Sequence, residues 1–387
     1  MKRSQDRILV THVGSLPRPA ELLDLLLARD NGEPYDAQRL DALQARGVSE
    51  IVRRQVELGI DVVNDGELGK TSFLTYVNTR LGGLEPRTST GAAPWATSRE
   101  AQAFPEYYAW AAKANPSGAA AALHLAATGP VTYTGMDALA TDIGHLKAAV
   151  AEHGAAEAFM PSISPTNVEG WQANEYYGSD EEFLFAIAEA MREEYRAIID
   201  SGLLLQIDDP GLVTQYTMRP GWSVEDVRAW GSVRVDALNQ ALRGLPADRI
   251  RFHTCYSINQ GPRQFELGLE DVIDLVLRIN AGAYSFEAAN PRHEHEWRVW
   301  KQADLPGQTL LIPGFITNSS VMIEHPDTVA DRIVRYAETV GRERVLAGAD
   351  CGFASFAANV EFMPEIVWAK LEALAEGARR ASERLWS

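Results

Sequence analysis

The sequence predicts an α/β protein, namely a single (β/α)8 or TIM barrel with inserted aromatic-rich segments. Short apolar runs alternate with amphipathic segments along nearly the whole chain, which is the pattern of parallel strands joined by helices. A length of 387 residues suits one such barrel with insertions. No glycine-rich dinucleotide fingerprint follows the expected strands, so a barrel is favoured over a doubly wound nucleotide-binding sheet.

The expected strands are short and apolar, and most of them end in polar residues or glycine. The eight strands cover residues 7–13, 60–64, 121–128, 203–208, 251–255, 283–288, 309–314 and 344–350. A further apolar segment, residues 157–162, is interpreted as an insertion rather than as a ninth strand. Amphipathic spacing predicts helices over residues 19–29, 37–58, 180–201 and 364–386.

Two segments break the alternation and are rich in aromatic residues. They lie at about 85–118, which includes Trp95 and Trp110, and at about 155–178, which includes Trp171. Long excursions of this kind are often lids or binding loops, and ordinary surface insertions are the alternative. No linker or internal repeat divides the sequence, so residues 1–387 are expected to form one domain.

The composition argues against several classes of partner. A net charge of −17 disfavours nucleic acid and anionic membrane surfaces, because both bind basic faces. Two cysteines cannot form a disulfide framework, and no apolar run is long enough to span a bilayer. A cytoplasmic protein is expected, and the sequence leaves its oligomeric state open.

The clearest sign of chemistry is a histidine two residues from a cysteine. His253 and Cys255 lie on the expected strand 251–255, and residues two apart on a strand point to the same face. Cys351 follows the strand 344–350, and Glu287 lies at the end of the strand 283–288. Zinc favours such mixed sulfur, nitrogen and oxygen ligands. On this spacing alone, two small buried cysteines without a metal are the alternative.

Two thiolate ligands would make a soft, electron-rich site. Metal coordination deprotonates a thiol while leaving a sulfur nucleophile at neutral pH. Hydrolytic zinc sites more often use histidine and carboxylate ligands. The residues therefore favour alkylation of a thiol substrate over hydrolysis.

Several short motifs occur in an order that resembles the catalytic barrel of the cobalamin-independent methionine synthase family. They are GSLPR (14–18), DGE (65–67), TGPVT (128–132), QIDDP (206–210), HTC (253–255), the strand with Glu287 and ADCGF (349–353). The resemblance implies a zinc ion in the barrel that activates homocysteine. The zinc ligands that it implies are His253, Cys255, Glu287 and Cys351.

The resemblance also implies residues that hold the amino acid part of the thiol substrate. These are Ser15, Glu67 and Asp208. Carboxylates suit an ammonium group, and a hydroxyl can donate to a carboxylate. Arg18, in the GSLPR motif, is a further candidate for binding an anionic group.

The chain departs from the family at the alkyl-donor end. It has room for one barrel, whereas the folate-dependent enzyme has two. The family's tryptophan for the folate ring has no counterpart at residues 133–136, and Asn318 and Ser319 stand where the family has a histidine. The resemblance therefore implies more about the zinc and the thiol than about the donor.

The stretch 287–297, EAANPRHEHEW, resembles a broader group of single-barrel proteins. One branch of that group opens epoxides with the thiol of coenzyme M. In that alternative, Arg263 or Arg292 could bind an anionic sulfonate. The candidates for catalytic groups are His12, His293 and Asp209.

The expected function is zinc-dependent transfer of an alkyl group to a thiol. Methyl is the favoured group and homocysteine the favoured thiol, which gives methionine as the product. The expected partners are a small thiol and an alkyl donor, which is either a small methylated compound or a corrinoid protein. The alternatives are thiol addition to an epoxide, a decarboxylase of the uroporphyrinogen type, and a non-catalytic zinc protein.

Overall fold

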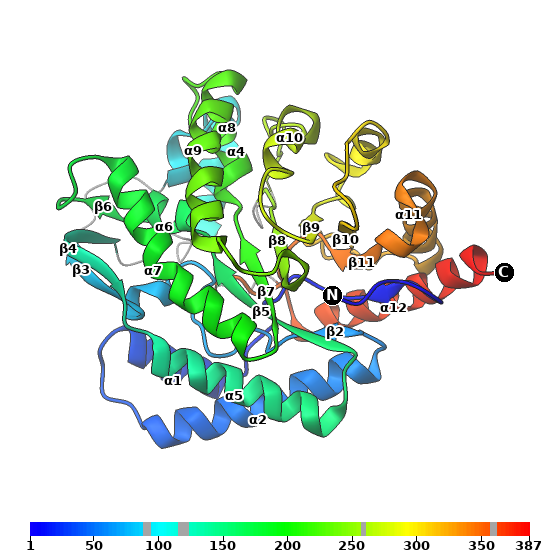
Figure 1. Cartoon of the computed structure of the whole chain (residues 1–387), viewed down its shortest axis with the longest axis horizontal. Coiled ribbons are helices and arrows are strands. Elements are labelled where there is room, and N and C mark those ends of the chain that lie inside the picture. Colours follow the sequence, from blue (N-terminus) through cyan, green and yellow to red (C-terminus); the bar gives the residue numbers. More distant parts are fainter. Residues whose placement is uncertain (88–93, 115–123, 257–260, 357–361) are drawn as a thin grey trace.

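A barrel of parallel strands forms the centre of the computed structural model, which describes residues 1–87, 94–114, 124–256, 261–356 and 362–387 (Figure 1). Its eight strands pair in the order β1-β11-β10-β9-β8-β7-β5-β2. A parallel bridge between Thr11 and Val62 joins the two ends of this order, so the barrel is nearly closed. The predicted (β/α)8 fold is therefore confirmed.

The staves of the barrel are short, and every pair among them is parallel. They are β1 (Leu9–Val10), β2 (Val62–Val63), β5 (Glu157–Ile163), β7 (Leu204–Asp208), β8 (Ile250–His253), β9 (Ala283–Phe286), β10 (Leu310–Ile316) and β11 (Leu346–Ala349).

The third stave differs from the one that the sequence predicted. β5 pairs with β2 and β7, and all its residues after Glu157 are buried. Part of the predicted strand 121–128 belongs instead to β4 (His124–Tyr133), which pairs antiparallel with β3 (Leu81–Arg87) outside the barrel. The prediction for these two segments was wrong, because both are short apolar runs that only long-range pairing distinguishes.

The helices surround the barrel, and the four predicted by amphipathic spacing are confirmed. α7, for example, begins at Asp180 because the Ser179 hydroxyl accepts a hydrogen bond from the Glu182 amide. The helices are α1 (Ala20–Asp30), α2 (Ala37–Glu57), α3 (Arg99–Ala103), α4 (Pro105–Ala114), α5 (Met136–His153), α6 (Pro165–Trp171), α7 (Asp180–Asp200), α8 (Gly211–Met218), α9 (Val224–Leu242), α10 (Ile273–Val276), α11 (Pro326–Val340) and α12 (Pro364–Leu385).

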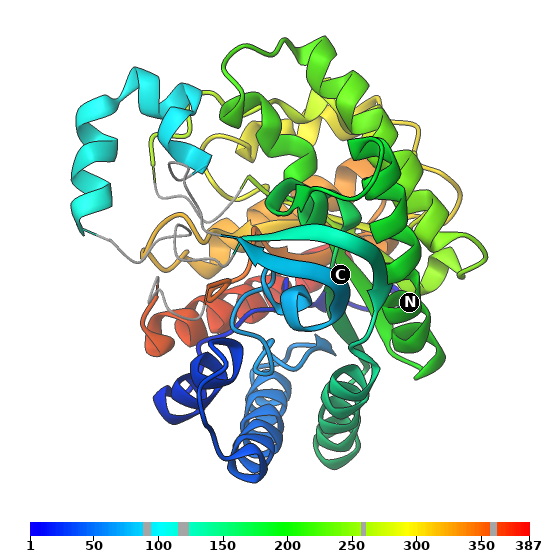
Figure 2. The ribbon, with the colours of Figure 1, turned by 90° about the vertical axis from the view of Figure 1, so that its left-hand side faces the viewer.

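The first predicted insertion contains α3 and α4, and the second contains α6 and a short strand, although its first residues form the barrel strand β5. α3 and α4 stand to one side of the barrel, and β3 and β4 cross in front of it (Figure 2). A third short strand, β6 (Ala173–Asn174), pairs with β4. Residues 88–93 and 115–123 of the first insertion lie outside the described residues.

The barrel interior changes from apolar to polar along the strands. An apolar cluster fills the part near the strand starts: Leu9, Val62, Phe159, Leu204, Ala283, Leu310, Ile312 and Leu346. Two residues further along four of these strands stand the buried polar residues Thr11, Asn64, Gln206 and Ser285. Because side chains two apart share a face, these polar groups form the next layer of the interior. The polar side chains of the barrel interior therefore lie toward the carboxyl ends of the strands.

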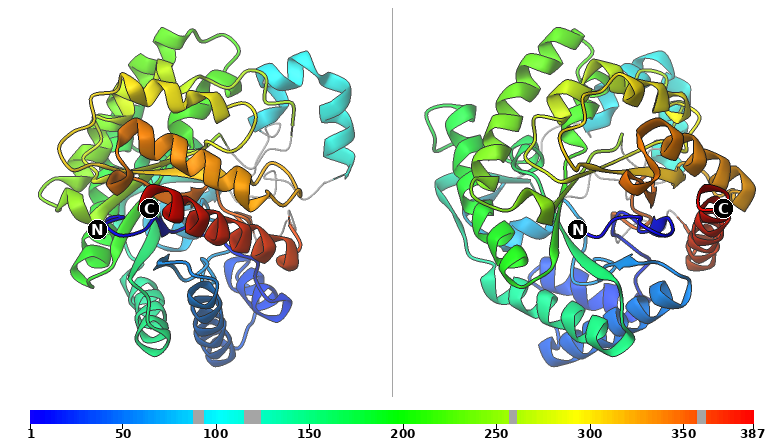
Figure 3. Two further views of the ribbon diagram at one scale, coloured as in Figure 1. Left: turned by 90° about the vertical axis from the view of Figure 1, so that its right-hand side faces the viewer. Right: turned by 45° about the vertical axis from the view of Figure 1, so that its right-hand side comes forward.

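The last two helices pack side by side along one flank of the barrel (Figure 3). The Arg380 guanidinium on α12 pairs with the Asp327 carboxylate on α11 at 2.8 Å. The Trp386 indole donates to the Gln5 carbonyl, which holds the end of the chain against its beginning. Among the described residues, none of the helices combines the length and apolarity that crossing a membrane requires.

Candidate metal centre

Three predicted ligands come together at the carboxyl ends of the barrel strands. His253 is the last residue of β8, Cys255 follows two residues later, and Cys351 follows β11. One ligand atom from each lies within 4.8 Å of the others, and all three residues are buried. The two-residue spacing therefore places His253 and Cys255 in one group, as predicted, and the barrel brings Cys351 to the same group.

His253 presents one free ring nitrogen. Its Nδ1 lies 3.2 Å from the Ser285 hydroxyl on β9, whereas its Nε2 is buried and has no hydrogen-bond partner among the described residues. Burial, with the nearby charge of Arg251, lowers the pKa of His253 to about 3. The imidazole is therefore neutral at pH 7, as a metal ligand must be. An orphaned buried nitrogen is costly, and a metal would satisfy it.

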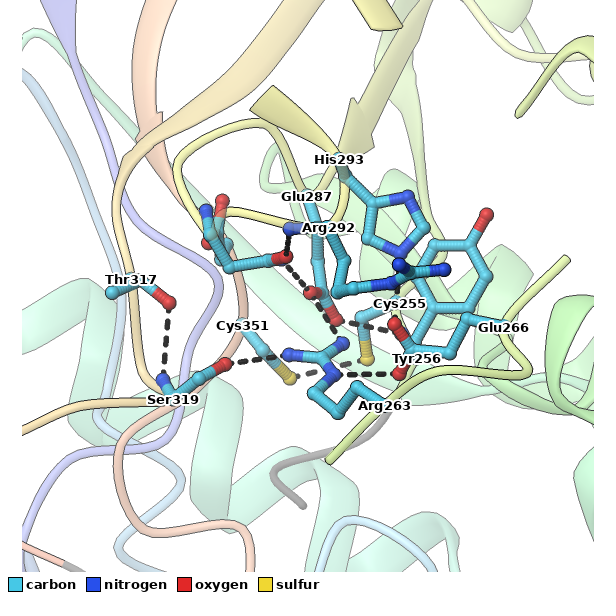
Figure 4. Close-up of polar contacts among 12 residues, drawn as sticks. Cys255, Tyr256, Arg263, Glu266, Glu287, Arg292, His293, Thr317, Ser319 and Cys351 are labelled. Carbon is cyan, nitrogen blue, oxygen red and sulfur yellow. Dashed lines mark hydrogen bonds and ion pairs between the residues drawn. The ribbon is translucent and has the colours of Figure 1, made fainter. Parts of the chain in front are cut away.

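The two cysteine sulfurs lie side by side. Their Sγ atoms are 3.2 Å apart, and both thiols are free (Figure 4). The contact with Cys255, together with burial, raises the pKa of the Cys351 thiol. A bound cation would reverse this shift and favour the thiolates.

Glu287 follows β9 but lies outside the group of three. Its Oε1 accepts a hydrogen bond from the Tyr256 amide at 2.7 Å, and its Oε2 accepts from Arg263 at 2.7 Å and from the Asn290 side chain. Burial raises its pKa to about 7, although Arg263 opposes the shift. Its role as a fourth ligand stays a prediction.

The donor set fits a zinc ion. Two thiols, one orphaned imidazole nitrogen and an adjacent carboxylate offer the sulfur, nitrogen and oxygen ligands of a thiolate-rich zinc site. Hard cations such as Mg²⁺ prefer oxygen ligands instead.

Two buried carboxylates lie near this group. Asp208 ends β7 and is paired in register with His253. Burial, and the neighbouring charge of Glu67, raise the pKa of Asp208 well above its ordinary value. Glu67 adopts a left-handed backbone conformation with φ 56°, and its Oε2 is buried without a partner among the described residues. An unpaired carboxylate next to a second one is suited to receive a cationic group.

Ser15 lies against the loop that carries Cys351. A Cβ atom on Gly352 would approach the Ser15 hydroxyl to 2.1 Å, so any larger residue there would displace that hydroxyl. The Ala354 amide donates to that hydroxyl at 3.3 Å. Arg18 donates to the Ala354 carbonyl and to the Glu67 carbonyl at 2.7 and 2.8 Å. Arg18 therefore ties two loops of the site together through backbone contacts.

The candidate catalytic groups already have partners. His12 Nε2 lies 2.8 Å from the Gln55 side chain on α2, and burial lowers the pKa of His12 to about 4. Asp209 accepts hydrogen bonds from Asn167 and the Leu212 amide, each at 3.0 Å. Both therefore have structural contacts, and their catalytic roles stay predictions.

His293 is also held on both sides. Its Nδ1 and Nε2 lie 2.9 Å from Glu296 and Glu266, and its ring stacks on Tyr256. Burial alone would lower the pKa of His293, but the two carboxylates raise it to about 9. Neither ring nitrogen is left to serve a substrate in this arrangement.

Sequence reasoning missed several residues that shape the site. Asp350, next to Cys351, accepts hydrogen bonds from the amides of residues 288–290 and so fixes the turn after Glu287. Ser285 could have been found, because it stands two residues before Glu287 on the same face. Asn290 and the structural role of Arg263 could not, since their contacts depend on loops.

Comparisons with known proteins show which proteins this chain is similar to. No family model matches the chain. A methionine synthase from Thermococcus kodakarensis is 25% identical over 88% of this chain and 85% of its own length. One from Saccharolobus islandicus is 24% identical over 97% of this chain and 95% of its own length. The chain is similar to methionine synthases over nearly its whole length. The resemblance that the motifs indicated is therefore confirmed.

A solved structure supports the fold. The B12-independent methionine synthase from Shewanella sp. W3-18-1 superposes with a TM-score of 0.72 at 19% identity, covering 98% of this chain and 99% of the other. At this identity the likeness shows the barrel fold rather than an activity.

Proposed function

We propose that this chain is a zinc-dependent enzyme that transfers a methyl group to the thiol of homocysteine and so forms methionine. The observation that carries the proposal is the group formed by the orphaned Nε2 of His253 and the paired sulfurs of Cys255 and Cys351 at the mouth of a barrel. The relatives named methionine synthase indicate a methyltransferase.

A zinc ion held by these residues, with Glu287 as the proposed fourth ligand, would keep a substrate thiol deprotonated at neutral pH. The chain's own residues would bind the rest of the amino acid. Asp208 and the free oxygen of Glu67 would receive its ammonium group, whose charge would relieve the repulsion between the two carboxylates. The Ser15 hydroxyl would donate to its carboxylate.

The methyl donor in this proposal is a small methylated compound. Nothing in the comparisons supports the corrinoid protein that the sequence analysis named as the other possibility. In the alternative of coenzyme M and an epoxide, Arg263 was a candidate for binding the sulfonate. Its guanidinium is already hydrogen-bonded to Glu266, Glu287 and Ser319, which weakens that alternative.

Metal analysis of the purified chain tests the proposal. We expect about one zinc per chain, and we expect Cys351→Ser to lose it, since a hydroxyl is a far weaker ligand than a thiolate. Cys351→Ser should also lose methyl transfer to homocysteine. A metal-free chain with full methyl transfer would contradict the proposal.

A panel of thiols then tests the substrate. Zinc X-ray absorption should detect an added sulfur neighbour with homocysteine, and should detect none with coenzyme M. In Asp208→Asn the homocysteine signal should require a higher concentration, because one partner of the ammonium group has lost its charge. If a sulfur neighbour is added with coenzyme M and not with homocysteine, homocysteine is not the substrate, whereas the zinc part of the proposal remains.

A further inference from the structure

Arg263 lies at the centre of the polar contacts around Glu287 (Figure 4). Its Nε donates to Glu266 at 2.5 Å, its Nη1 donates to the Ser319 hydroxyl at 2.5 Å, and its Nη2 donates to Glu287 at 2.7 Å. The side chain is 4% exposed, and that of Glu287 is fully buried. Every nitrogen of this guanidinium therefore has a fixed partner within the site.

The contacts continue outward as a row of alternating charges. Glu287 pairs with Arg263, Arg263 with Glu266, Glu266 with His293, and His293 with Glu296. Each inner member of the row is paired with an opposite charge on both sides. Removing an inner member therefore leaves buried charges unpaired. The row has one end at the predicted fourth metal ligand.

The backbone holds Arg263 in an unusual conformation. Its φ is 55°, in the left-handed region that residues other than glycine seldom adopt. Two residues later, the Phe265 amide donates to Glu100 on α3, and the Phe265 carbonyl accepts from Thr217 on α8. The segment 263–266 is thus held by elements outside the barrel, one of them from the aromatic insertion. A strained backbone that its surroundings hold in place is typical of functional sites.

Ser319 connects this arrangement to the loop after β10. It stands in the segment where the resembling family has a histidine, and its amide donates to the Thr317 hydroxyl at 3.0 Å. Arg263 therefore links the loop after β10 to the carboxylate beside the two cysteines.

We propose that Arg263 is a positioning residue that fixes the Glu287 carboxylate beside the cysteine pair and thereby sets the affinity of the site for its metal. The inference rests on the proposed function, since it assumes that the site takes zinc. It assigns Arg263 no contact with a substrate. Hydrogen-bonding partners of a ligating carboxylate generally contribute to metal affinity through orientation.

The test is a competition for zinc between the purified chain and a chelator. Arg263→Met should weaken zinc binding by about 10- to 100-fold, the usual cost of losing such a partner. Cobalt(II) loaded in place of zinc should show a changed visible spectrum, because the carboxylate is no longer held. Arg263→Lys keeps the charge but has a single nitrogen for three contacts. Its zinc affinity should therefore be several-fold below that of the wild type, and its cobalt spectrum should lie between those of the wild type and Arg263→Met.

Arg234→Met is the matched control. Arg234 is likewise paired with a carboxylate, Glu169, at 2.9 Å and is 11% exposed, but it lies on α9 and its partner lies on α6, outside the row of charges that ends at Glu287. It should leave zinc affinity and the cobalt spectrum unchanged.

The outcomes separate the two claims. A wild-type chain that binds no zinc would contradict the proposed function. Wild-type affinity and an unchanged spectrum in Arg263→Met would overturn the positioning role and leave the proposed function in place. If Arg263→Met does not fold, unchanged affinity in Arg263→Lys would overturn the role equally.

Discussion

His293 is a residue whose charge state depends on its two neighbours. Burial by itself would keep the imidazole neutral, but Glu266 and Glu296 raise its pKa to about 9. In the unfolded chain the pKa returns to about 6.5. The interaction therefore stabilises the fold fully below pH 6.5 and is lost as the pH rises through 9.

His293→Gln tests this interaction through the pH dependence of stability. The free energy of unfolding of the wild-type chain should fall by roughly 3 kcal/mol more than that of the variant between pH 6.5 and pH 9.5, because the pKa of His293 is about 9 in the fold and about 6.5 in the unfolded chain. Urea titrations at several pH values measure the difference. If the free energies of unfolding of the two proteins change in parallel with pH, His293 is not protonated in the fold.

At the same scale, the sequence predicted those site residues whose placement depends only on local strand geometry. The spacing of His253 and Cys255 needs only the alternation of a strand, and the structure shows that alternation. The contacts of Arg263 could not be predicted, because its partners come from three separate loops and its backbone is left-handed. Long-range polar contacts of this kind leave no periodic pattern in a sequence.

At the scale of elements, the pairing partners of a strand determine whether it belongs to the barrel, and the apolar pattern of the sequence does not. β4 and β5 both read as short apolar strands, yet β5 is a stave and β4 pairs with β3 outside the barrel. The helices were easier to predict, since α2, α7 and α12 repeat their buried residues over several turns.

Arg99 attaches the helices of the first insertion to the rest of the molecule. Its guanidinium donates to the carbonyls of Tyr216 and Trp222 and lies 4.1 Å from the Tyr216 ring centroid. Arg99→Ala should release α3 and α4, so that their amides exchange with deuterium roughly tenfold faster. Amides of α12 should exchange as in the wild type. Equal rates in α3 and α4 would show that other contacts hold the insertion.

At the scale of the whole molecule, the metal group joins staves that are not neighbours. His253 and Cys255 belong to β8 and the segment after it, and Cys351 follows β11, with β9 and β10 between them in the barrel. A bound ion would connect these parts in the folded state, and the unfolded chain lacks the preformed site. Metal binding should therefore stabilise the entire barrel rather than one loop.

Denaturant unfolding with and without zinc measures this stabilisation. Free zinc at a hundred times its dissociation constant should raise the free energy of unfolding by about 2.7 kcal/mol, with all spectroscopic probes of the barrel shifting together. Cys351→Ser should lose most of the increase, because the group keeps only one thiol. Ser201→Ala, far from the group on the loop before β7, should keep it. An equal increase in Cys351→Ser would place the stabilising metal elsewhere, since a site that does not use this sulfur cannot join β8 to β11.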